Sequence, residues 1–487
     1  MSHPLSAATH DAWAQAWHAA PPLARLGHFN DRLWQALGGD ASALGRWQLQ
    51  APMAVLPSSF RGDEMMVHLQ GLVALAAGEV MRRRGGPERG VLIDPVHAAL
   101  QARSERHLRV DGGPVSELWD PLSGLYACQD GHVRLHMNFP HHRQGILDLL
   151  DAAPTRDAVE AALASWPALA VEVEASRRGL VATAWRTDAQ WQAHPQADAL
   201  RDEPVIRLSR VDTGAPASRG LAPWREGQGA LHGVRVFELT RIIAGPVAGR
   251  TLAAHGADVL HVSAGHLPSL DGLLMDTGRG KRTAQLDLRQ ASQRGQALSL
   301  LESADVFLHG YRPGGVASLG LDDATLMARN PSLVVAELRA YGFSGPWAQR
   351  RGFDSLTQTA TGLNDEERRA FGDARPRAFP AQWLDHGAAY LLALGIQMAL
   401  ARRQEEGGAW KVEVSLAGCA NWLRSFGRQE ADLAPEPQEA LVWPWLGEWS
   451  GSMGRVQGLR PCGALEGVPL DWRHGACRLG DHLPQWA

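Results

Sequence analysis

Lysine is almost missing from this 487-residue sequence. Of its 48 basic residues, 46 are arginine, and only Lys281 and Lys411 are lysine. A strong net charge is missing as well, because 52 acidic residues leave a formal charge of −4. This balance gives no reason to expect a nucleic acid or an anionic membrane as a partner. In a chain so biased toward arginine, each retained lysine raises the question of what arginine cannot do there.

Cysteine and long apolar runs are also scarce. The four cysteines are scattered and form no C-x-x-C pair, which argues against a disulfide framework and against a zinc site. The longest apolar stretch, Tyr390 to Ala401, is about half of the ~20 residues that a bilayer span needs. The N-terminal residues MSHPLSAATHDAW lack the basic start and apolar middle of a signal peptide. We therefore expect a soluble cytoplasmic protein without a metal.

The length predicts more than one domain, since 487 residues exceed the usual size of a single core. An apolar helix is expected over 65–84, ended by arginines and by Gly85-Gly86. Asp130-Gly131, between two alternating segments, predicts a β-hairpin whose turn residues have positive φ. The elements expected to complete a small α+β unit are helices at about 141–151, 155–165 and 167–178 and a strand at 181–185.

Strands alternate with helical segments in the second half of the chain, which argues for a Rossmann-like, doubly wound parallel sheet in an α/β fold. The expected strands are 234–239, 258–262, 283–286, 305–308 and 333–338. The predicted division is a helical lead-in (1–45), an N-terminal partial unit (46–214) with a small α+β domain (about 120–210), a linker (215–230), the Rossmann-like large domain (231–425) and a C-terminal return segment (426–487).

A weak internal repeat connects the two halves. Asp63 precedes a long apolar helix, an arginine-rich end and a Gly-Gly pair, and Asp385 precedes the same series of features. The shared pattern is consistent with duplication, and also with any two capped amphipathic helices. We expect Asp63 to be a helix cap.

A dinucleotide site is disfavoured, although the strand before AGPVAG suggests a phosphate-binding loop. Gly245 and Gly249 do not give G-x-G-x-x-G, and Pro246 lies inside the turn. The acidic residue expected after the second strand is missing, because Ser263 and Ala264 follow Val262. An NAD-linked oxidoreductase therefore remains a minor alternative.

Six segments in order resemble the class III CoA-transferases of the CaiB/BaiF type, the group that contains carnitine CoA-transferase and formyl-CoA transferase. They read LHGVRVFELTRIIAGPVAGRTLAAHGADVLHV, GRGKRTAQLDLR, ADVFLHGYRPGGVASLGLD, YGFSGPW, RGFDSLTQ and LDHGAAYLLALG ending in WKVEVSL. Segment 120–210 looks like the family's small domain, and CRLGDHLP at 477–484 resembles the family's C-terminal ending. In this chain the segment that looks like the small domain precedes the segments that resemble the large domain. Family members form interlocked dimers, so the resemblance implies a homodimer or an intrachain pseudo-dimer.

Asp385, in LDHGAAY, matches the catalytic carboxylate of the family. By its position alone it would be a helix N-cap, and the two readings are partly compatible, because a helix dipole stabilises the carboxylate as an ionised nucleophile. The resemblance implies attack of Asp385 on an acyl-CoA thioester, an aspartyl-CoA thioester, and transfer of the CoA to an incoming carboxylic acid. Gly387 leaves little side-chain bulk beside the nucleophile, which is consistent with backbone N–H groups approaching an oxyanion and also with an ordinary glycine at a helix N-terminus.

Further positions match the family's CoA-binding loops. The resemblance implies that cations there pair with the phosphates of coenzyme A. For each position, ordinary loop packing remains an alternative. The matched residues are Arg241, Ile243, Ala244, Lys281, Arg282, Tyr311, Arg312, Arg339 and Tyr341.

The sequence also departs from the family. Ser263-Ala264-Gly265 stand where many relatives carry a Glu and an Arg for the adenosine end of CoA, and Gly310 stands where relatives often have Asn. Phe353 occupies the position of the base histidine in the racemase branch, and a phenyl ring cannot transfer a proton. A CoA-transferase is therefore the leading prediction, and a degenerate CoA-binding or scaffold relative is the alternative.

Overall fold

The computed structural model describes residues 22–51, 53–115, 118–213, 220–429 and 434–487. The helical lead-in predicted for 1–45 and the linker predicted for 215–230 therefore lie partly outside the described residues. Within the described part of the lead-in, α2 (Pro22–Ala36) and the 3-10 helix η1 (Ala41–Arg46) are helical.

The centre of the molecule is a seven-stranded sheet with the order β10-β9-β8-β11-β12-β13-β7. All pairs are parallel except β13 with β7. Counted from β8, the six parallel strands have the order 3-2-1-4-5-6, so the winding reverses between β8 and β11. The predicted α/β class is confirmed. The strands are β7 (Arg207–Val211), β8 (Arg235–Leu239), β9 (Asp258–Ser263), β10 (Arg282–Gln285), β11 (Val306–His309), β12 (Val334–Arg339) and β13 (Ala409–Ser415).

Each face of this sheet is covered by helices because successive strand residues point to opposite sides. Val236, Val306 and Val334 belong to the core beneath α10 (Ala244–Ala254) and α16 (Trp383–Glu406). Phe237 and Phe307 belong to a second core beneath α12 (Ala291–Glu302) and α13 (Asp323–Arg329). The remaining helices of this half are α11 (Asp271–Thr277), α14 (Asp354–Ala360), α15 (Leu363–Phe371), α17 (Leu416–Ser425), α18 (Glu439–Val442) and the 3-10 helices η3 (Ala317–Leu319) and η4 (Trp443–Trp445).

Helix α16 is the central element of the larger core. Among the described helices it alone is long and apolar enough to cross a bilayer, and its whole apolar window is buried inside the protein. It packs against α10, against β13 and against α3 (Gly62–Arg82) of the N-terminal half. Its composition therefore matches the inside of a folded core.

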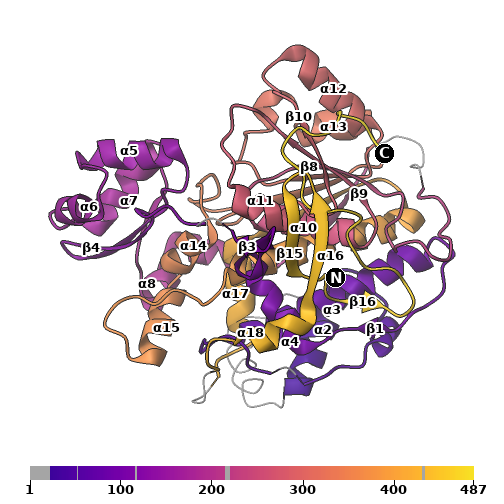
Figure 1. Cartoon of the computed structure of the whole chain (residues 1–487), viewed down its shortest axis with the longest axis horizontal. Coiled ribbons are helices and arrows are strands. Elements are labelled where there is room, and N and C mark those ends of the chain that lie inside the picture. The colour runs from indigo at the N-terminus through magenta and orange to yellow at the C-terminus, as the bar shows by residue number, and fades with distance from the viewer. Residues whose placement is uncertain (1–21, 52, 116–117, 214–219, 430–433) are drawn as a thin grey trace.

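A small α+β unit stands apart from the central sheet (Figure 1). Its three-stranded sheet has the order β4-β5-β6 and its own apolar core. The hairpin predicted at Asp130-Gly131 is present, but its two turn residues are Gln129 and Asp130, and neither of these nor Gly131 has a positive φ. The predicted turn geometry is therefore wrong. The elements are β4 (Gly124–Cys128), β5 (Gly131–Leu135), β6 (Ala182–Ala184), α5 (Pro140–Leu150), α6 (Arg156–Leu163) and α7 (Ala168–Arg177), followed by α8 (Asp188–Gln192) and α9 (Pro195–Leu200).

The N-terminal and C-terminal parts of the chain are interleaved. One small sheet has the order β14-β15-β2-β3, and another pairs β1 with β16. Strand β7, from the N-terminal half, completes the edge of the central sheet. The two halves are therefore in contact along several elements. These are β1 (Val91–Leu92), α4 (Pro95–Leu100), the 3-10 helix η2 (Gln101–His107), β2 (Arg109–Val110), β3 (Gly113–Pro114), β14 (Leu446–Gly451), β15 (Gly454–Leu459) and β16 (Ala464–Leu465).

The two helices of the predicted repeat, α3 and α16, lie against each other. Their beginnings meet where a Cβ added at Gly62 would lie 2.2 Å from the Trp383 ring, and their ends meet in the Arg83–Glu405 ion pair. Asp63 does not cap its own helix. Its Oδ2 accepts hydrogen bonds from the backbone N–H groups of Val55 (2.7 Å) and Leu56 (3.0 Å), so the expected cap is wrong.

Asp63 leads to a stability prediction. Burial raises the pKa of this carboxyl from 3.8 to about 6, even though two N–H groups bond to it. Because the pKa of Asp63 is higher in the folded than in the unfolded protein, the neutral carboxyl group contributes to stability at low pH. This contribution is lost as the pH rises from the unfolded-state pKa, about 4, through the folded-state pKa, about 6. Asp63→Asn keeps the acceptor and removes the charge. We therefore expect its free energy of unfolding, relative to wild type, to rise by about 3 kcal/mol between pH 3 and pH 8.

Urea denaturation of both proteins at the two pH values measures this change. The comparison cancels all groups that titrate identically in the variant and the wild type. The same relative stability at both pH values would contradict the assigned burial of an ionised Asp63.

Candidate active site

Asp385 lies in the first turn of α16, buried with 7% of its surface exposed. It is not the cap of this helix, as its position in the sequence suggested. The cap residue is Gln382, without a side-chain bond, and the N–H groups of Leu384 (2.8 Å) and Asp385 (2.9 Å) donate to Asp354 Oδ2. Asp354, from the start of α14, therefore neutralises the helix N-terminus in place of Asp385.

The surroundings of Asp385 favour its protonated form. Burial raises the pKa of Asp385 well above its usual range, and the nearby carboxylates of Asp354 and Glu105 raise it further. Burial also raises the pKa of Asp354 to about 6, despite its hydrogen bonds from the α16 backbone. The expectation that the helix dipole keeps Asp385 ionised is therefore wrong, because the dipole acts on Asp354 instead.

Asp385 opens onto a cavity of about 380 Å³. The N-terminal half contributes one part of its wall, from η2 to the residues just after β5. The turn after β8, α11, α14 and the start of α16 contribute the other. The lining residues are Glu105, Arg106, Leu108, Pro114, Val115, Leu118, Trp119, His136, Asn138, Ile242, Ile243, Leu273, Phe353, Asp354, Ser355, Gln382 and Asp385. Neither half of the chain encloses this space alone.

The turn after β8 lines both this cavity and a smaller one of about 50 Å³. Ile242 lines both, and its φ of 73° is unusual for a β-branched side chain. Such strain persists only where the surrounding structure holds it, and it is frequent at functional sites. The turn lies at the carboxyl end of β8, beside the reversal of winding, where ligands bind in open α/β sheets.

Arg241 and Tyr311 line the smaller cavity together. The Arg241 guanidinium donates to the backbone oxygen of Pro268 and lies 4.4 Å from the centre of the Phe139 ring. Ile243 lines the larger cavity, and Ala244 is buried in the first turn of α10. Of the predicted CoA-binding residues, the structure thus brings Arg241, Ile243 and Tyr311 to the two cavities.

Lys281 and Arg282 are placed elsewhere. Lys281 is 0% exposed, and its Nζ donates to Glu238 Oε1 (2.9 Å) and to the backbone oxygen of Pro246 (2.6 Å). The space beside this carboxylate is tight, because a Cβ at Gly249 would lie 1.9 Å from Glu238 Oε2, and a compact ammonium suits it better than a planar guanidinium. The predicted phosphate contact of Lys281 is therefore contradicted, and the retained lysine is explained by packing. Arg282 pairs with Asp258 at 2.9 Å.

Three further predicted residues are not gathered at the cavities. Arg312 is exposed. Arg339 donates to Glu337 (2.7 Å) and covers the Phe343 ring. Tyr341 is buried against Trp347. None of these three lines either cavity, so the structure does not support their predicted place in a CoA channel.

Gly387 also differs from its predicted role. A Cβ there would lie 2.6 Å from Cys419 Sγ and 3.0 Å from Met65 Cε. The glycine therefore allows α16 to approach α17 and α3 closely, and its small size does not open the cavity.

Sequence reasoning missed Glu105, Trp119 and His136 as lining residues, and it missed the capping role of Asp354. Glu105 lies within η2, and its Oε2 is 3.2 Å from His386 Nε2. The His136 ring stacks on Phe353 with a centroid distance of 3.9 Å. The sequence did contain a signal for Asp354, because this residue directly follows Phe353 in RGFDSLTQ, one of the six segments that resemble the family.

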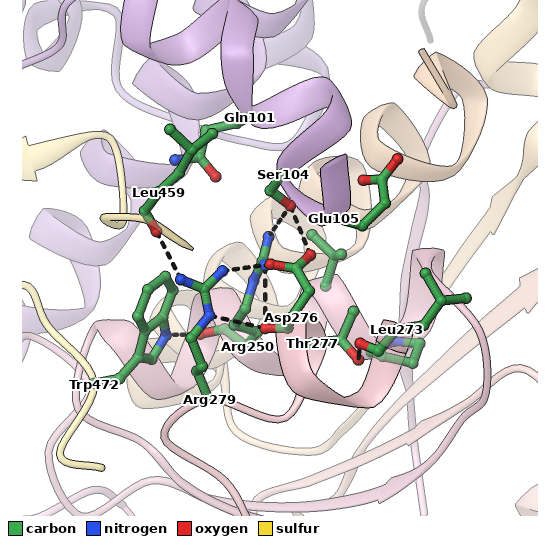
Figure 2. A network of polar contacts seen from close by, with 12 residues as sticks. Gln101, Ser104, Glu105, Arg250, Leu273, Asp276, Thr277, Arg279, Leu459 and Trp472 are labelled. Atoms are coloured by element: carbon green, nitrogen blue, oxygen red, sulfur yellow. Dashed lines mark hydrogen bonds and ion pairs between the residues drawn. The ribbon is translucent and has the colours of Figure 1, made fainter. Parts of the chain in front are cut away.

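A buried network fixes the position of η2 beside the cavity (Figure 2). Asp276 accepts hydrogen bonds from Ser104 Oγ (2.7 Å), from Arg250 Nη1 (2.5 Å) and from Arg279. Arg279 also donates to the backbone oxygen of Leu459 (2.8 Å). The network joins the N-terminal half, α10, α11 and the C-terminal strands, and Ser104 directly precedes Glu105.

The sequence was compared with known families and proteins. Residues 231–439 match the model of the family described as CoA-transferase family III. We call these residues the family III segment. The family III segment includes Asp385, the first turn after β8 and the whole parallel part of the central sheet, whereas Glu105, Trp119 and His136 lie before it.

Several curated proteins are similar to this chain. A probable fatty acyl-CoA transferase of Mycobacterium tuberculosis is 32% identical over 43% of this chain and 57% of its own length. An acyl-CoA transferase of Gibberella moniliformis is 27% identical over 80% of this chain and 76% of its own. A formyl-CoA:oxalate CoA-transferase of Rhodopseudomonas palustris is 29% identical over 43% and 51%. The chain thus spans about half the length of two of these three relatives.

Two solved structures are similar to parts of this chain. A crystal structure of the Mycobacterium tuberculosis protein is 31% identical, with a TM-score of 0.37 over 41% of this chain and 59% of that one. A CaiB/BaiF family protein from Brucella suis is 27% identical, with a TM-score of 0.37 over 47% and 65%.

Proposed function

We propose that this chain is an acyl-CoA:carboxylate CoA-transferase that works through a covalent intermediate on Asp385. The observation that carries the proposal is a buried carboxyl group at the wall of a cavity of about 380 Å³, within the segment that matches the model of CoA-transferase family III. The names of the similar proteins, acyl-CoA transferase and formyl-CoA:oxalate CoA-transferase, support the same reaction class.

The reaction splits one transfer into steps at the Asp385 carbonyl. The Asp385 carboxylate attacks the thioester carbonyl, the C–S bond breaks, and an acyl-aspartyl anhydride and CoA thiolate form. The thiolate attacks the aspartyl carbonyl and releases the first acid as its carboxylate. The acceptor carboxylate then attacks the aspartyl-CoA thioester, and the returning thiolate takes the acceptor acyl group and frees Asp385.

Because its pKa is raised, Asp385 has to lose a proton before it can act in the first step. Only the ionised carboxylate attacks, so the proton favoured by burial and by Asp354 and Glu105 must leave before or during substrate binding. A desolvated carboxylate is also a stronger nucleophile than a hydrated one once it is formed, because no water shell has to be removed.

The CoA body is assigned to the side of the turn after β8. The smaller cavity shares Ile242 and Leu273 with the larger one, and Arg241 and Tyr311 line it. The Rossmann-like strand order supports this assignment, because the crevice beside a reversal of winding is the usual ligand position. The N-terminal half then serves as an intrachain partner, since Glu105 and Trp119 line the same cavity.

Chemical trapping tests the covalent intermediate. The protein is incubated with an acyl-CoA and then with hydroxylamine, which cleaves an anhydride or thioester and leaves a hydroxamate on the attacked carboxyl group. Peptide mass spectrometry is expected to find the hydroxamate on Asp385, and not on Asp354 or Glu105. Modification of Asp354 or Glu105 alone would contradict the assignment, and no modification at all would favour a CoA-binding relative without turnover.

A further inference from the structure

The lining of the large cavity combines three carboxyl groups with a larger set of apolar side chains. The carboxyl groups of Glu105 and Asp354 lie close enough to Asp385 to raise its pKa, and polar Ser355 and Gln382 also line the cavity. The rest of the described wall is mostly apolar. Its apolar side chains are Leu108, Pro114, Val115, Leu118, Trp119, Ile242, Ile243, Leu273 and Phe353.

Cations are scarce in this wall. Of the described lining residues, Arg106 alone carries a permanent positive charge. Its side chain is 41% exposed, and its Nε lies 4.0 Å from Glu105 Oε1. His136 adds no charge near neutral pH, because burial lowers its pKa to about 3. A second anionic group carried in by a substrate would therefore face several carboxyl groups and lack a buried cation as partner.

We propose that this cavity receives the acyl group of a compact, apolar monocarboxylic acid and discriminates against dicarboxylic acyl groups. The inference rests on the proposed function, in which the thioester carbonyl lies at Asp385. The distal end of the acyl group then meets the rest of the lining, which is mostly apolar. The cavity volume of about 380 Å³ is near the lower end of the range for small-molecule sites, which selects compact acyl groups.

Much of the selecting wall comes from residues outside the family III segment. Trp119 is held in place by the Arg134 guanidinium at 5.6 Å and by an edge contact with His136 at 5.8 Å. His136 in turn stacks on Phe353, beside the capping Asp354. The N-terminal half therefore determines substrate selection at Trp119, and membership of the family alone does not fix it.

A pair of CoA thioesters that differ only at the distal end tests the inference. Butyryl-CoA and succinyl-CoA have the same four-carbon chain, and succinyl carries a carboxylate where butyryl carries a methyl group. Wild-type protein is expected to favour butyryl-CoA as donor by at least about tenfold in kcat/KM, because a buried unpaired charge is disfavoured. Equal or better use of succinyl-CoA would overturn the inference.

Two substitutions at Trp119 provide a matched comparison. Trp119→Arg places a cation at the apolar end and is expected to lower the butyryl-to-succinyl ratio by at least about tenfold. Trp119→Phe keeps an apolar ring and is expected to change the ratio by less than about threefold. An unchanged ratio in a folded Trp119→Arg protein would also overturn the inference.

Binding separates this inference from the proposed function. Calorimetric dissociation constants of butyryl-CoA, succinyl-CoA and free CoA are measured on Asp385→Asn, which binds without turnover. Butyryl-CoA is expected to bind more tightly than free CoA, and succinyl-CoA no more tightly. If the wild type transfers no CoA but this order holds, the proposed function fails and the apolar site stands. If transfer occurs and the order is reversed, the apolar site fails alone.

Discussion

Asp385→Asn is expected to lower kcat for CoA transfer by at least about a thousandfold, because an amide cannot form the anhydride or the thioester. The fold is expected to persist. The neutral amide has nearly the same size as the protonated carboxyl group that burial favours at this position, so the surrounding packing is kept. The measurement is transfer of CoA from butyryl-CoA to an added carboxylic acid, with thermal unfolding recorded on the same samples.

Asp63→Asn is the matched control for this substitution. Asp63 also lies in the first turn of a long buried helix and has a raised pKa, but it lines neither of the two cavities described. Its variant is expected to keep kcat within about twofold of the wild type. An active Asp385→Asn protein would overturn the covalent mechanism. An inactive but folded Asp63→Asn protein would instead assign a function to the first helix of the repeat.

Asp63 and Asp385 lie at similar positions in the first turns of two long helices, but their side chains have different surroundings. Each carboxyl group is buried at the start of a long core helix, and neither caps its own helix. Asp63 is occupied by the N–H groups of Val55 and Leu56. At Asp385 the helix N–H groups bond to Asp354 instead, which leaves the Asp385 side chain facing the cavity. Because Asp354 binds the helix N–H groups, Asp385 is not needed as a cap, and its side chain is available as the proposed nucleophile.

The sequence was sufficient to predict the parallel strands and Asp385. Alternating apolar runs have a period that only a few elements satisfy, so the strands from 234 to 338 were found within a residue or two. Asp385 was found because its segment resembles a family motif. These predictions depend on residues close together in the chain.

The partners of buried charges could not be predicted in the same way. Lys281 is paired with Glu238, which is 43 residues away, and Glu105 reaches His386 across 281 residues. Whether a cation faces solvent or a buried carboxylate depends on how the sheet and helices pack, and no local pattern encodes it. The apolar wall around Trp119 was missed for the same reason.

Removal of the Asp276 carboxylate is expected to cause the largest loss of stability. Asp276 and its partners Arg250 and Arg279 are at most 2% exposed. Burial alone would raise the pKa of Asp276, but the two guanidinium groups outweigh it and lower the pKa, which shows how strongly they stabilise the ionised form. Asp276→Ala leaves both guanidinium groups buried without their shared carboxylate. We expect a loss of about 3–5 kcal/mol in the free energy of unfolding, measured by urea denaturation.

Glu302→Ala is the control, because its ion pair with Arg329 is about half exposed on both sides. Its expected loss is below about 1 kcal/mol. A loss of similar size in the two variants would show that the buried network contributes no more than a surface pair. The network also holds Ser104, so Asp276→Asn, which keeps the shape without the charge, is expected to weaken the placement of Glu105 as well. Stability and the geometry of the cavity therefore depend on the same buried carboxylate, because it ties the N-terminal half to the family III segment.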